Sequence, residues 1–325
     1  MQIRSLKGLN YSLKPVSEED ASFIIKARLE DSNRNRFIHK ISSSIEDQIQ
    51  WIKDYRNRRN EYYFVVVNNI SSESEGLISL YNISNEQAEW GRWVILKNSF
   101  AAVESIALIF KFAFDKLRLK KVYSLTIKDN VSTVSLHDSL KEKKEGIIKN
   151  YFEFNSRTYD AVKHYVDSEY YYEFEKKYLL SNVIKLWRRN FRQICGSFVF
   201  NHIGIATDSI LDECIFFKML GYSEYSCLFE DEKQGIIGQF LSAKNQPTIE
   251  LLANSSESHT LDPYLGKGIK IYHYGYFVEN FDASCHFFSK SGFKLVKKPM
   301  ISSYFKKRIA FFMYKNLFVI EIIGN

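Results

Sequence analysis

Hydrophobic and polar positions follow the same order twice in the second half of the chain. Residues 198–206 are rich in β-branched and aromatic side chains, which is typical of a strand. Residues 208–220 then place apolar side chains at helical spacing, and three shorter apolar runs end near residue 252. We therefore predict two βαβββ modules. Their helices are expected at 208–220 and 283–291, and their strands at 198–206, 223–229, 235–243, 247–252, 271–278, 294–298, 308–314 and 317–323.

The two modules share identical residues at an offset of 71 positions, which indicates a duplication. Gly221 is placed to end the first helix in a left-handed conformation, which glycine adopts without steric cost. The identical pairs are His202 and His273, Gly204 and Gly275, Cys214 and Cys285, Phe216 and Phe287, Phe217 and Phe288, Gly221 and Gly292, and Glu250 and Glu321.

Two histidines and two glutamates interrupt otherwise apolar strands of these modules. Each module has one histidine in its first strand and one glutamate in its last. A lone carboxylate on a buried sheet face is costly and needs a partner. Imidazole and carboxylate are good ligands for divalent first-row metals. The repeated pattern therefore predicts a metal site formed by His202, Glu250, His273 and Glu321.

Paired βαβββ modules with these four residues resemble the vicinal oxygen chelate superfamily, which includes glyoxalase I, methylmalonyl-CoA epimerase, extradiol dioxygenases and bleomycin-resistance proteins. The resemblance covers residues 198–324, and the segments 201–206 and 307–311 are similar to the epimerase branch. It implies a divalent ion (Zn, Ni, Co, Mn or Fe) on His202, Glu250, His273 and Glu321, with Glu321 also as a metal-bound base. The epimerases carry a glutamate base on the middle strand, where this chain has Gly238.

The first half of the chain predicts a mixed sheet flanked by helices. Ser17, followed by three acidic residues, has the pattern of a helix N-cap. A long helix is expected at 101–117, because apolar residues recur there at helical spacing. Other helices are predicted after residue 20 and at 45–56, 131–140 and 169–189, and strands at 11–16, 62–68, 76–82, 88–96, 121–127, 146–154 and 159–167.

This order of elements resembles the GCN5-related N-acetyltransferase (GNAT) fold over residues 10–178, and looks closest to amino-sugar and ribosomal-protein acetyltransferases. The segments that carry the resemblance are 88–94, 112–114, 121–123, Asn130 and 159–160. On this resemblance, Glu89 is expected to act as the base or to orient a water molecule, and His137 stands where the family has a tyrosine acid. The resemblance also implies an acetyl-CoA site. The residues expected to bind acetyl-CoA are Val94, Ser99, Ala101, Ala102 and Asn130.

The segment expected to bind the pyrophosphate of acetyl-CoA departs from the family pattern. Small residues normally let the backbone N–H groups at the helix start approach the phosphates. Ala101 and Ala102 keep the loop small, but Glu104 falls where glycine or alanine is usual. An acidic side chain there would repel pyrophosphate unless it points away.

Composition and charge place a domain boundary near residues 190–197. The net charge of +7 lies entirely before residue 196, and so do all four tryptophans, whereas most glycines follow it. We predict an α+β protein with a GNAT-like domain at 1–180, a helical linker at 181–196 and a vicinal oxygen chelate domain at 197–325.

The four cysteines form no CxxC pair and are expected to be reduced core thiols.

The same features limit the partners and the location. The basic residues are too dispersed to predict nucleic-acid binding, and a basic first half suits an anionic small molecule. No apolar run reaches the roughly 20 residues that span a bilayer, and the first residues lack the apolar core of a signal peptide. We expect a cytoplasmic protein without membrane insertion, for which a homodimer is allowed.

The combined hypothesis is a bifunctional enzyme. Its first domain would use acetyl-CoA to N-acetylate an amino sugar, linked to a nucleotide, for a surface polysaccharide. Its second domain would catalyse a metal-dependent reaction of the glyoxalase or epimerase type. Two alternatives stay open: a metal-dependent isomerase, epimerase or lyase with a non-catalytic first domain, which Glu104 favours, and a non-catalytic ligand-binding second domain, which Gly238 favours.

Overall fold

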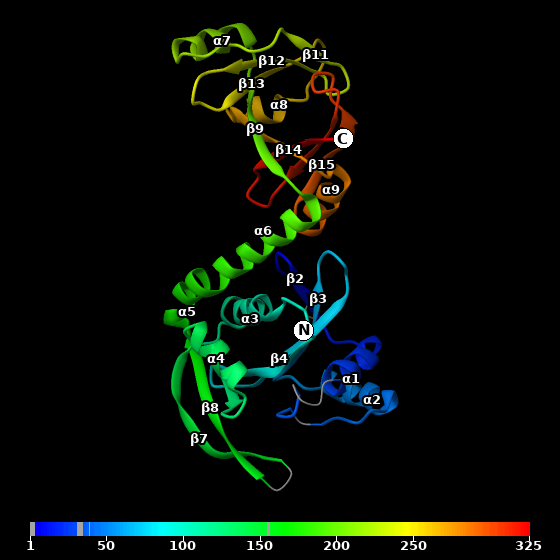
Figure 1. Cartoon of the computed structure of the whole chain (residues 1–325), viewed down its shortest axis with the longest axis vertical. Coiled ribbons are helices and arrows are strands. Elements are labelled where there is room, and N and C mark those ends of the chain that lie inside the picture. Colours follow the sequence, from blue (N-terminus) through cyan, green and yellow to red (C-terminus); the bar gives the residue numbers. More distant parts are fainter. Residues whose placement is uncertain (1–3, 31–34, 39, 155–156) are drawn as a thin grey trace. The chain divides into compact units, whose positions relative to one another are not determined.

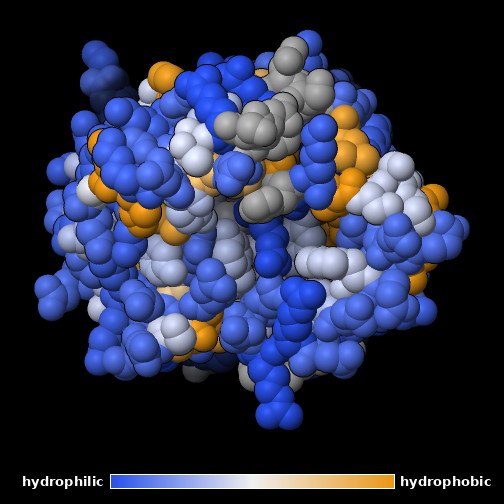
Figure 2. All heavy atoms as spheres, turned by 90° about the horizontal axis from the view of Figure 1, so that it is seen from below, coloured by the Kyte–Doolittle hydropathy of each residue, from blue (hydrophilic) through white to orange (hydrophobic). Residues whose placement is uncertain are grey.

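The computed structural model describes residues 4–30, 35–38, 40–154 and 157–325 (Figure 1). Its contacts divide the chain into two compact units, Met1–Trp187 (unit 1) and Arg188–Asn325 (unit 2). No helix in the described ranges is both long and apolar enough to span a membrane. On the face drawn in Figure 2, apolar residues lie in small separate patches among hydrophilic ones.

Unit 1 combines one eight-stranded sheet with helices, as the sequence predicts. Its strands are β1 (Leu6–Lys7), β2 (Tyr11–Pro15), β3 (Tyr62–Asn68), β4 (Ser74–Ser84), β5 (Gln87–Ile95), β6 (Lys121–Ile127), β7 (Lys143–Phe154) and β8 (Arg157–Asp167). Its helical segments are η1 (Glu18–Asp20), α1 (Ala21–Leu29), α2 (Ile45–Arg56), α3 (Ala102–Lys111), η2 (Phe112–Lys116), α4 (Val131–Ser139), α5 (Ser168–Phe174) and η3 (Glu175–Leu180). Helix α6 (Ser181–Cys195) begins in unit 1 and ends in unit 2.

The sheet of unit 1 has the order β1-β2-β3-β4-β5-β6-β8-β7. All neighbouring strands are antiparallel except β5 and β6, which pair in parallel. That parallel pairing covers only Gln87–Glu89 of β5 against Lys121–Tyr123 of β6. The later residues of both strands are therefore not paired with each other, and the sheet opens in its middle. Two apolar clusters complete the unit; one contains α3 and the other contains α1 and α2.

Unit 2 consists of the two predicted modules in one sheet. The first module has β9 (Phe198–Ala206), α7 (Ile210–Met219), β10 (Ser223–Glu224), β11 (Phe229–Asp231), β12 (Ile236–Ser242) and β13 (Thr248–Asn254). After the short α8 (Asp262–Leu265), the second has β14 (Ile271–Val278), α9 (Phe281–Lys290), β15 (Lys294–Ile301), β16 (Arg308–Met313) and β17 (Val319–Gly324). The strand expected at 223–229 is divided into β10 and β11, which both pair with β12. The predicted α+β fold class is confirmed in both units.

The modules join through their first strands. The sheet order is β10-β12-β13-β9-β14-β17-β16-β15, with β9 antiparallel to β14. Each first strand is also parallel to the last strand of its own module, β13 or β17. Gly221 and Gly292 follow the two helices with φ of +90° and +86°, so Gly221 has the conformation expected of it. Cys195 and Cys214 are buried and Cys285 is partly buried, whereas Cys227 is exposed. The prediction of a core thiol is therefore wrong for Cys227.

Candidate functional sites

The four predicted metal ligands of unit 2 meet at one point. His202 and His273 lie on the central strands β9 and β14, and Glu250 and Glu321 on the adjoining strands β13 and β17. One ligand atom from each residue lies within 4.8 Å of all the others. All four residues are buried, with at most 6% of their surface exposed. Strand order thus brings together side chains that the sequence separates.

The distances within this quartet suit a single cation. The two Nε2 atoms are 2.8 Å apart. Glu250 Oε2 lies 3.1 Å from His202 Nε2 and 3.3 Å from His273 Nε2, and Glu321 Oε2 lies at 3.3 Å and 3.5 Å from the same atoms. Metal bonds of about 2.1 Å in a tetrahedral arrangement separate neighbouring ligand atoms by about 3.4 Å. The four distances between carboxylate oxygens and imidazole nitrogens lie near that value, whereas the two Nε2 atoms are closer together.

Two further observations fit a metal. Asn201 Oδ1 lies 2.8 Å from His202 Nδ1 and can only accept, so it fixes the proton on Nδ1 and leaves Nε2 free to bind a cation. Glu321 Oε2 is buried and makes no hydrogen bond within the described residues, although it faces both imidazoles. Two carboxylates with two neutral imidazoles also balance the charge of a divalent ion in this buried place.

Without a bound cation, the same contacts shift the ionisation of the quartet, so that protons on the histidines balance the two carboxylates. Burial alone would lower the pKa of His202, but the carboxylates of Glu250 and Glu321 raise it to about 10. Burial would raise the pKa of Glu250, but His202 and His273 lower it to about 2. The pKa of His273 is also raised, because both carboxylates outweigh its burial. The ionised form of each of these side chains is thus stabilised by neighbouring groups of opposite charge.

Two glycines make room for the histidine rings. In the antiparallel pairing of β9 with β14, His202 lies opposite Gly275 and His273 lies opposite Gly204. A Cβ atom on Gly275 would lie only 2.1 Å from the His202 ring, and one on Gly204 only 2.3 Å from the His273 ring. Each module therefore supplies one histidine and the space for the histidine of the other. The sequence contains a sign of this role of the glycines, because the spacing His-x-Gly occurs in both modules at the offset of 71. Our sequence prediction did not use it.

Aromatic rings close the metal quartet from several sides. Phe305 stacks on His202 and Phe240 meets it edge-on, while Tyr272 and Phe311 pack on His273. Sequence reasoning did not identify these residues, because they come from four different strands and loops. Such an apolar surrounding excludes water and strengthens the attraction between the ligands and a cation.

The middle-strand position of the first module has no space for a side chain. A Cβ atom on Gly238 would lie 2.3 Å from Cζ of Phe229. The Phe229 ring also stacks on Phe240, which fixes it in that place. A glutamate base at this position, as in the epimerases, would therefore require the Phe229 ring to move.

Unit 1 contains a cavity of about 1010 Å³ at the place where β5 and β6 separate. Residues 89–95 of β5 line it on one side and residues 124–127 of β6 on the other. Further lining comes from α1 and α2 and from the segment around residue 99. Where β5 and β6 do not pair, the edges of the two strands face this cavity, and their backbone donors and acceptors do not bond to each other.

Glu89 lies on the wall of this cavity with two hydrogen-bond donors holding its carboxylate. Tyr81 Oη donates to Oε1 at 2.8 Å, and Asn82 Nδ2 donates to Oε2 at 3.1 Å. Burial raises the pKa of Glu89 above its usual range, although both hydrogen bonds oppose the shift. A carboxylate with a raised pKa is a better proton acceptor near neutral pH. Tyr81 and Asn82 were missed by the sequence reasoning, because they lie on β4 and reach Glu89 only through cross-strand pairing.

His137 lies behind the cavity wall rather than on it. It is 1% exposed, and its Nε2 lies 3.3 Å from Thr126 Oγ1 and 3.5 Å from Ser124 Oγ. Both hydroxyl residues line the cavity. On the other side of the ring, Nδ1 lies 2.9 Å from Oε1 of the buried Glu142. The predicted acid therefore reaches the cavity only through a hydroxyl group, and Thr126, Ser124 and Glu142 are residues that the sequence reasoning missed.

Four of the five residues expected to bind acetyl-CoA line the cavity, and the fifth does not. Val94, Ser99, Ala102 and Asn130 line the cavity. Ala101 is fully buried, and its N–H donates to Ser99 Oγ at 3.1 Å, so this group is already satisfied. The free backbone N–H groups at the start of α3 therefore begin at Ala102.

Glu104 points away from the start of α3. Its carboxylate is 2% exposed and accepts hydrogen bonds from the backbone N–H groups of Leu9 and Asn10 and from Asn10 Nδ2. It thereby ties the segment between β1 and β2 to α3. The electrostatic objection to pyrophosphate binding that the sequence raised therefore does not hold, since the charge is used elsewhere.

We expect Glu104→Ala to destabilise unit 1 by about 2–5 kcal/mol, because it removes the acceptor for the backbone N–H groups of Leu9 and Asn10 and for one hydrogen bond of Asn10 Nδ2, which keeps its other bond to Val183 O. Chemical denaturation followed by circular dichroism measures this loss. Glu104→Gln keeps one acceptor oxygen and should lose less. Equal stability of Glu104→Ala and the native chain would contradict this role of the carboxylate.

Two family models match this chain. Residues 11–141 match the acetyltransferase (GNAT) domain, and residues 201–312 match the glyoxalase/bleomycin resistance protein/dioxygenase superfamily. No curated protein sequence matches.

Solved structures similar to this chain include several acetyltransferases. Apo FdhC, a nucleotide-linked sugar GNAT, is 26% identical with a TM-score of 0.46, over 54% of this chain and 98% of its own. A GCN5-related N-acetyltransferase from Brucella melitensis is 17% identical with a TM-score of 0.48, over 55% and 85%. A variant of the spermidine N-acetyltransferase SpeG from Vibrio cholerae is 21% identical with a TM-score of 0.45, over 51% and 98%. The chain thus contains a GNAT acetyltransferase domain, matched over residues 11–141, and a domain of the glyoxalase/bleomycin resistance protein/dioxygenase superfamily, matched over residues 201–312.

Proposed function

We propose that the first domain transfers an acetyl group from acetyl-CoA to the amino group of a nucleotide-linked amino sugar, in the cytoplasm and for a surface polysaccharide. In this proposal residues 1–180 are the transferase domain, 181–196 a linker and 197–325 the metal-binding domain. The observation that carries the transferase assignment is the carboxylate of Glu89, with its raised pKa, on the wall of the cavity between β5 and β6.

The separated strands and the start of α3 suit acetyl-CoA, which supplies the activated acetyl group. Val94 belongs to the part of β5 that pairs with β4 but not with β6, so this edge of the strand faces the cavity. Ala102 begins α3, whose N-terminal N–H groups attract a pyrophosphate. Ser99 and Asn130 add polar side chains at the same cavity.

Proton transfers in this cavity fall to two groups. Glu89 accepts a proton from the ammonium group of the acceptor, directly or through a water molecule, which leaves a nucleophilic amine. When the amine forms its bond to the acetyl carbon and the carbon–sulfur bond breaks, the CoA thiolate is the leaving group. His137 donates a proton to this thiolate through the hydroxyl group of Thr126, with Glu142 beside its other ring nitrogen. Tyr81 and Asn82 keep the Glu89 carboxylate oriented toward the cavity.

The lining of the cavity suits an anionic substrate with a flat ring. Arg28, Lys40 and Arg92 line the cavity together with the aromatic side chains of Trp51 and Tyr63. Guanidinium and ammonium groups bind phosphates, and aromatic faces stack on nucleobases. A nucleotide-linked sugar combines both features, whereas a polyamine carries only positive charge.

Release of free CoA thiol tests the transferase. Purified protein with acetyl-CoA should release thiol with nucleotide-linked amino sugars, and much less with the same free amino sugars or with spermidine. Thiol release with spermidine alone would refute the anionic substrate. The absence of release with every amine would refute the transferase.

For the second domain we propose a divalent metal held by His202, Glu250, His273 and Glu321. A bound divalent ion would act as a Lewis acid toward a substrate oxygen. The carboxylates of Glu250 and Glu321 are the groups that can hold a proton there, and Glu321 is the base proposed for a glyoxalase-like or epimerase-like reaction. The four side chains orient one another and exclude water through their aromatic neighbours.

Metal analysis tests this site. We expect about one divalent ion per chain in the native protein and none in His273→Ala, because loss of one of four ligands opens the site. His286→Ala removes an exposed histidine from α9 of the same unit and should leave the metal content unchanged. Equal metal in native protein and His273→Ala would contradict the assignment.

A non-catalytic second domain is the alternative that one observation favours. The quartet is buried, and Phe229 fills the space beside Gly238 where a base would stand. Closed four-ligand sites are typical of structural metals. In that case removing the metal with a chelator would lower the melting temperature of unit 2 without changing the conversion of any vicinal oxygen substrate.

A further inference from the structure

Helix α7 of unit 2 carries an unusual number of exposed apolar side chains. Leu211, Ile215 and Met219 are 71%, 52% and 74% exposed, and Phe216 and Leu220 beside them are 48% and 51% exposed. We call these five residues the α7 stripe. The first three are spaced by four residues and therefore lie on one side of the helix. Exposing them to water is costly in a soluble unit.

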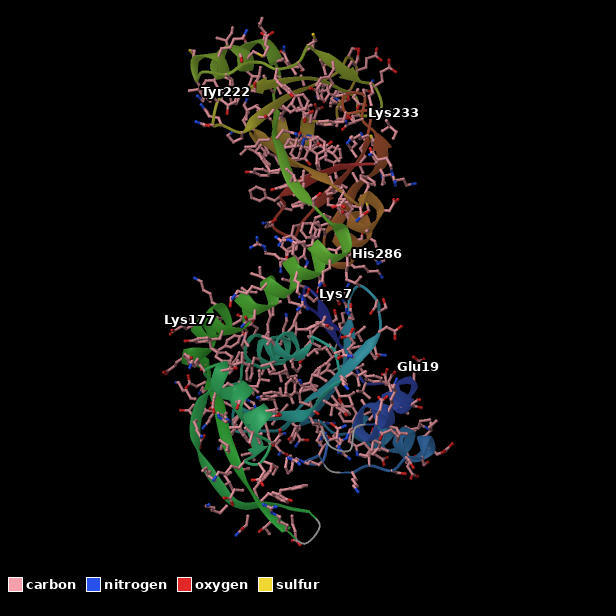
Figure 3. All side chains as sticks on the ribbon, viewed as in Figure 1. Lys7, Glu19, Lys177, Tyr222, Lys233 and His286 are labelled. Atoms are coloured by element: carbon pink, nitrogen blue, oxygen red, sulfur yellow. The ribbon has the colours of Figure 1, made fainter. Side chains whose placement is uncertain are left out.

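The duplication provides an internal comparison. At the offset of 71, Leu211, Ile215 and Met219 correspond to Asp282, His286 and Lys290 of α9, all polar and exposed. His286 is labelled on α9 in Figure 3, and α7 lies at the far end of unit 2 from it. The same helix position in the same module fold is thus compatible with polar residues.

The rest of the stripe also differs from its counterpart. Phe287, the counterpart of Phe216, is 1% exposed because it packs on Phe191 of α6, with ring centroids 5.2 Å apart. In the second module a helix therefore covers this side of α9. The helix of the first module has the apolar residues for such a contact, whereas Phe216 and its neighbours stay exposed in the chain by itself.

The α7 stripe is complementary to itself. If two copies of α7 cross in antiparallel orientation about a twofold axis at Ile215, Leu211 of each copy faces Met219 of the other. The same arrangement places Asp212 of each copy opposite Lys218 of the other. An isologous contact of this kind uses one patch on both subunits and closes after two copies. In this antiparallel arrangement, apolar residues of one copy face apolar residues of the other, and acidic residues face basic ones.

We propose that a second copy of this chain covers the α7 stripe, so that the protein forms a twofold dimer through unit 2. Leu211, Ile215 and Met219, with roughly 100 Å² of exposed area each, would bury about 300 Å² per copy, while Phe216 and Leu220 lie outside the centre of the contact. The total stays below the roughly 1,000 Å² of a stable specific interface and corresponds to a weak, transient dimer. The dimer therefore dissociates at low protein concentration.

Exchange of the stripe for its counterpart tests the proposal. The triple variant Leu211→Asp, Ile215→His and Met219→Lys uses residues that the chain carries at the matching positions of α9. Sedimentation velocity should show a dimer in the native chain, with dissociation in the micromolar range, and a monomer in the triple variant. Leu317→Asn changes an equally exposed leucine in the left-handed conformation, which asparagine tolerates, and should keep the dimer. A native chain that stays monomeric, or a dimer that survives the triple variant, would overturn the proposal.

Disulfide trapping tests the proposed twofold axis at Ile215 without depending on how stable the dimer is. Packed helices lie about 8–10 Å apart, so the two Cα atoms of residue 215 come to about 5 Å, within disulfide range. In a Cys227→Ser background, which removes the exposed thiol, Ile215→Cys should form an oxidised dimer. Leu211→Cys should not, because each residue 211 faces residue 219 of the other copy. Equal cross-linking of both variants, or of neither, would refute the twofold axis at Ile215.

Discussion

Gly275→Ala should remove most of the metal from unit 2, although glycine contributes no ligand. The new Cβ atom would lie 2.1 Å from the ring of His202, so the ring must move away from the other three ligands. Changes that displace a ligand without removing it typically cost 10–100-fold in metal affinity. Overpacking also costs about 1–3 kcal/mol of stability. Metal content by mass spectrometry and competition with a chelator measure the effect.

Two comparisons separate this displacement from general damage to the fold. Gly204→Ala should act in the same way on His273, because the two glycines are equivalent by the duplication. Gly266→Ala introduces a methyl group in the same unit, away from the quartet, and should retain full metal content. Native affinity in Gly275→Ala would show that the histidine rings do not have to stay in place.

Glu89→Gln should reduce the rate of acetyl transfer by about 10²–10⁴-fold, the usual contribution of a general base. The amide keeps the shape of the side chain but accepts no proton at neutral pH. Binding of acetyl-CoA should be unchanged, so the loss appears in kcat. Steady-state kinetics on the substrate found by thiol release, together with calorimetric binding of acetyl-CoA, measure the two quantities.

The pH dependence gives this prediction a second readout. Glu89 must be deprotonated to act, and burial raises its pKa, so the native rate should fall as pH decreases through that raised pKa. A raised pKa in the folded state also means that the ionised carboxylate costs stability at higher pH. Glu89→Gln should therefore lose this acid limb of the rate profile.

Glu86→Gln is the matched control for Glu89→Gln. Glu86 lies in the turn before β5, and its carboxylate pairs with Lys120 at an exposed position. Because Glu86 does not belong to the cavity wall, this variant should keep both the rate and its pH profile. Equal losses in the two variants would assign the effect to the charge of the domain rather than to a base.

The sequence by itself determined the duplication and the quartet. Strand and helix periodicity, which is local, gave the order of nearly every element, and the offset of 71 related His202 to His273 and Glu250 to Glu321. Because duplicated modules place equivalent residues at equivalent positions, one repeated polar pattern within apolar strands was enough to predict that the four side chains meet.

Only the tertiary structure decided the directions and neighbours of the other groups. Glu104 is turned toward Asn10, which is distant in sequence, so its effect on a pyrophosphate could not be predicted from the loop alone. His137 is separated from the cavity by Thr126, and the space beside Gly238 is filled by Phe229. These contacts depend on how strands pair and pack, and a pattern along the chain records the residue types but not which residues become neighbours.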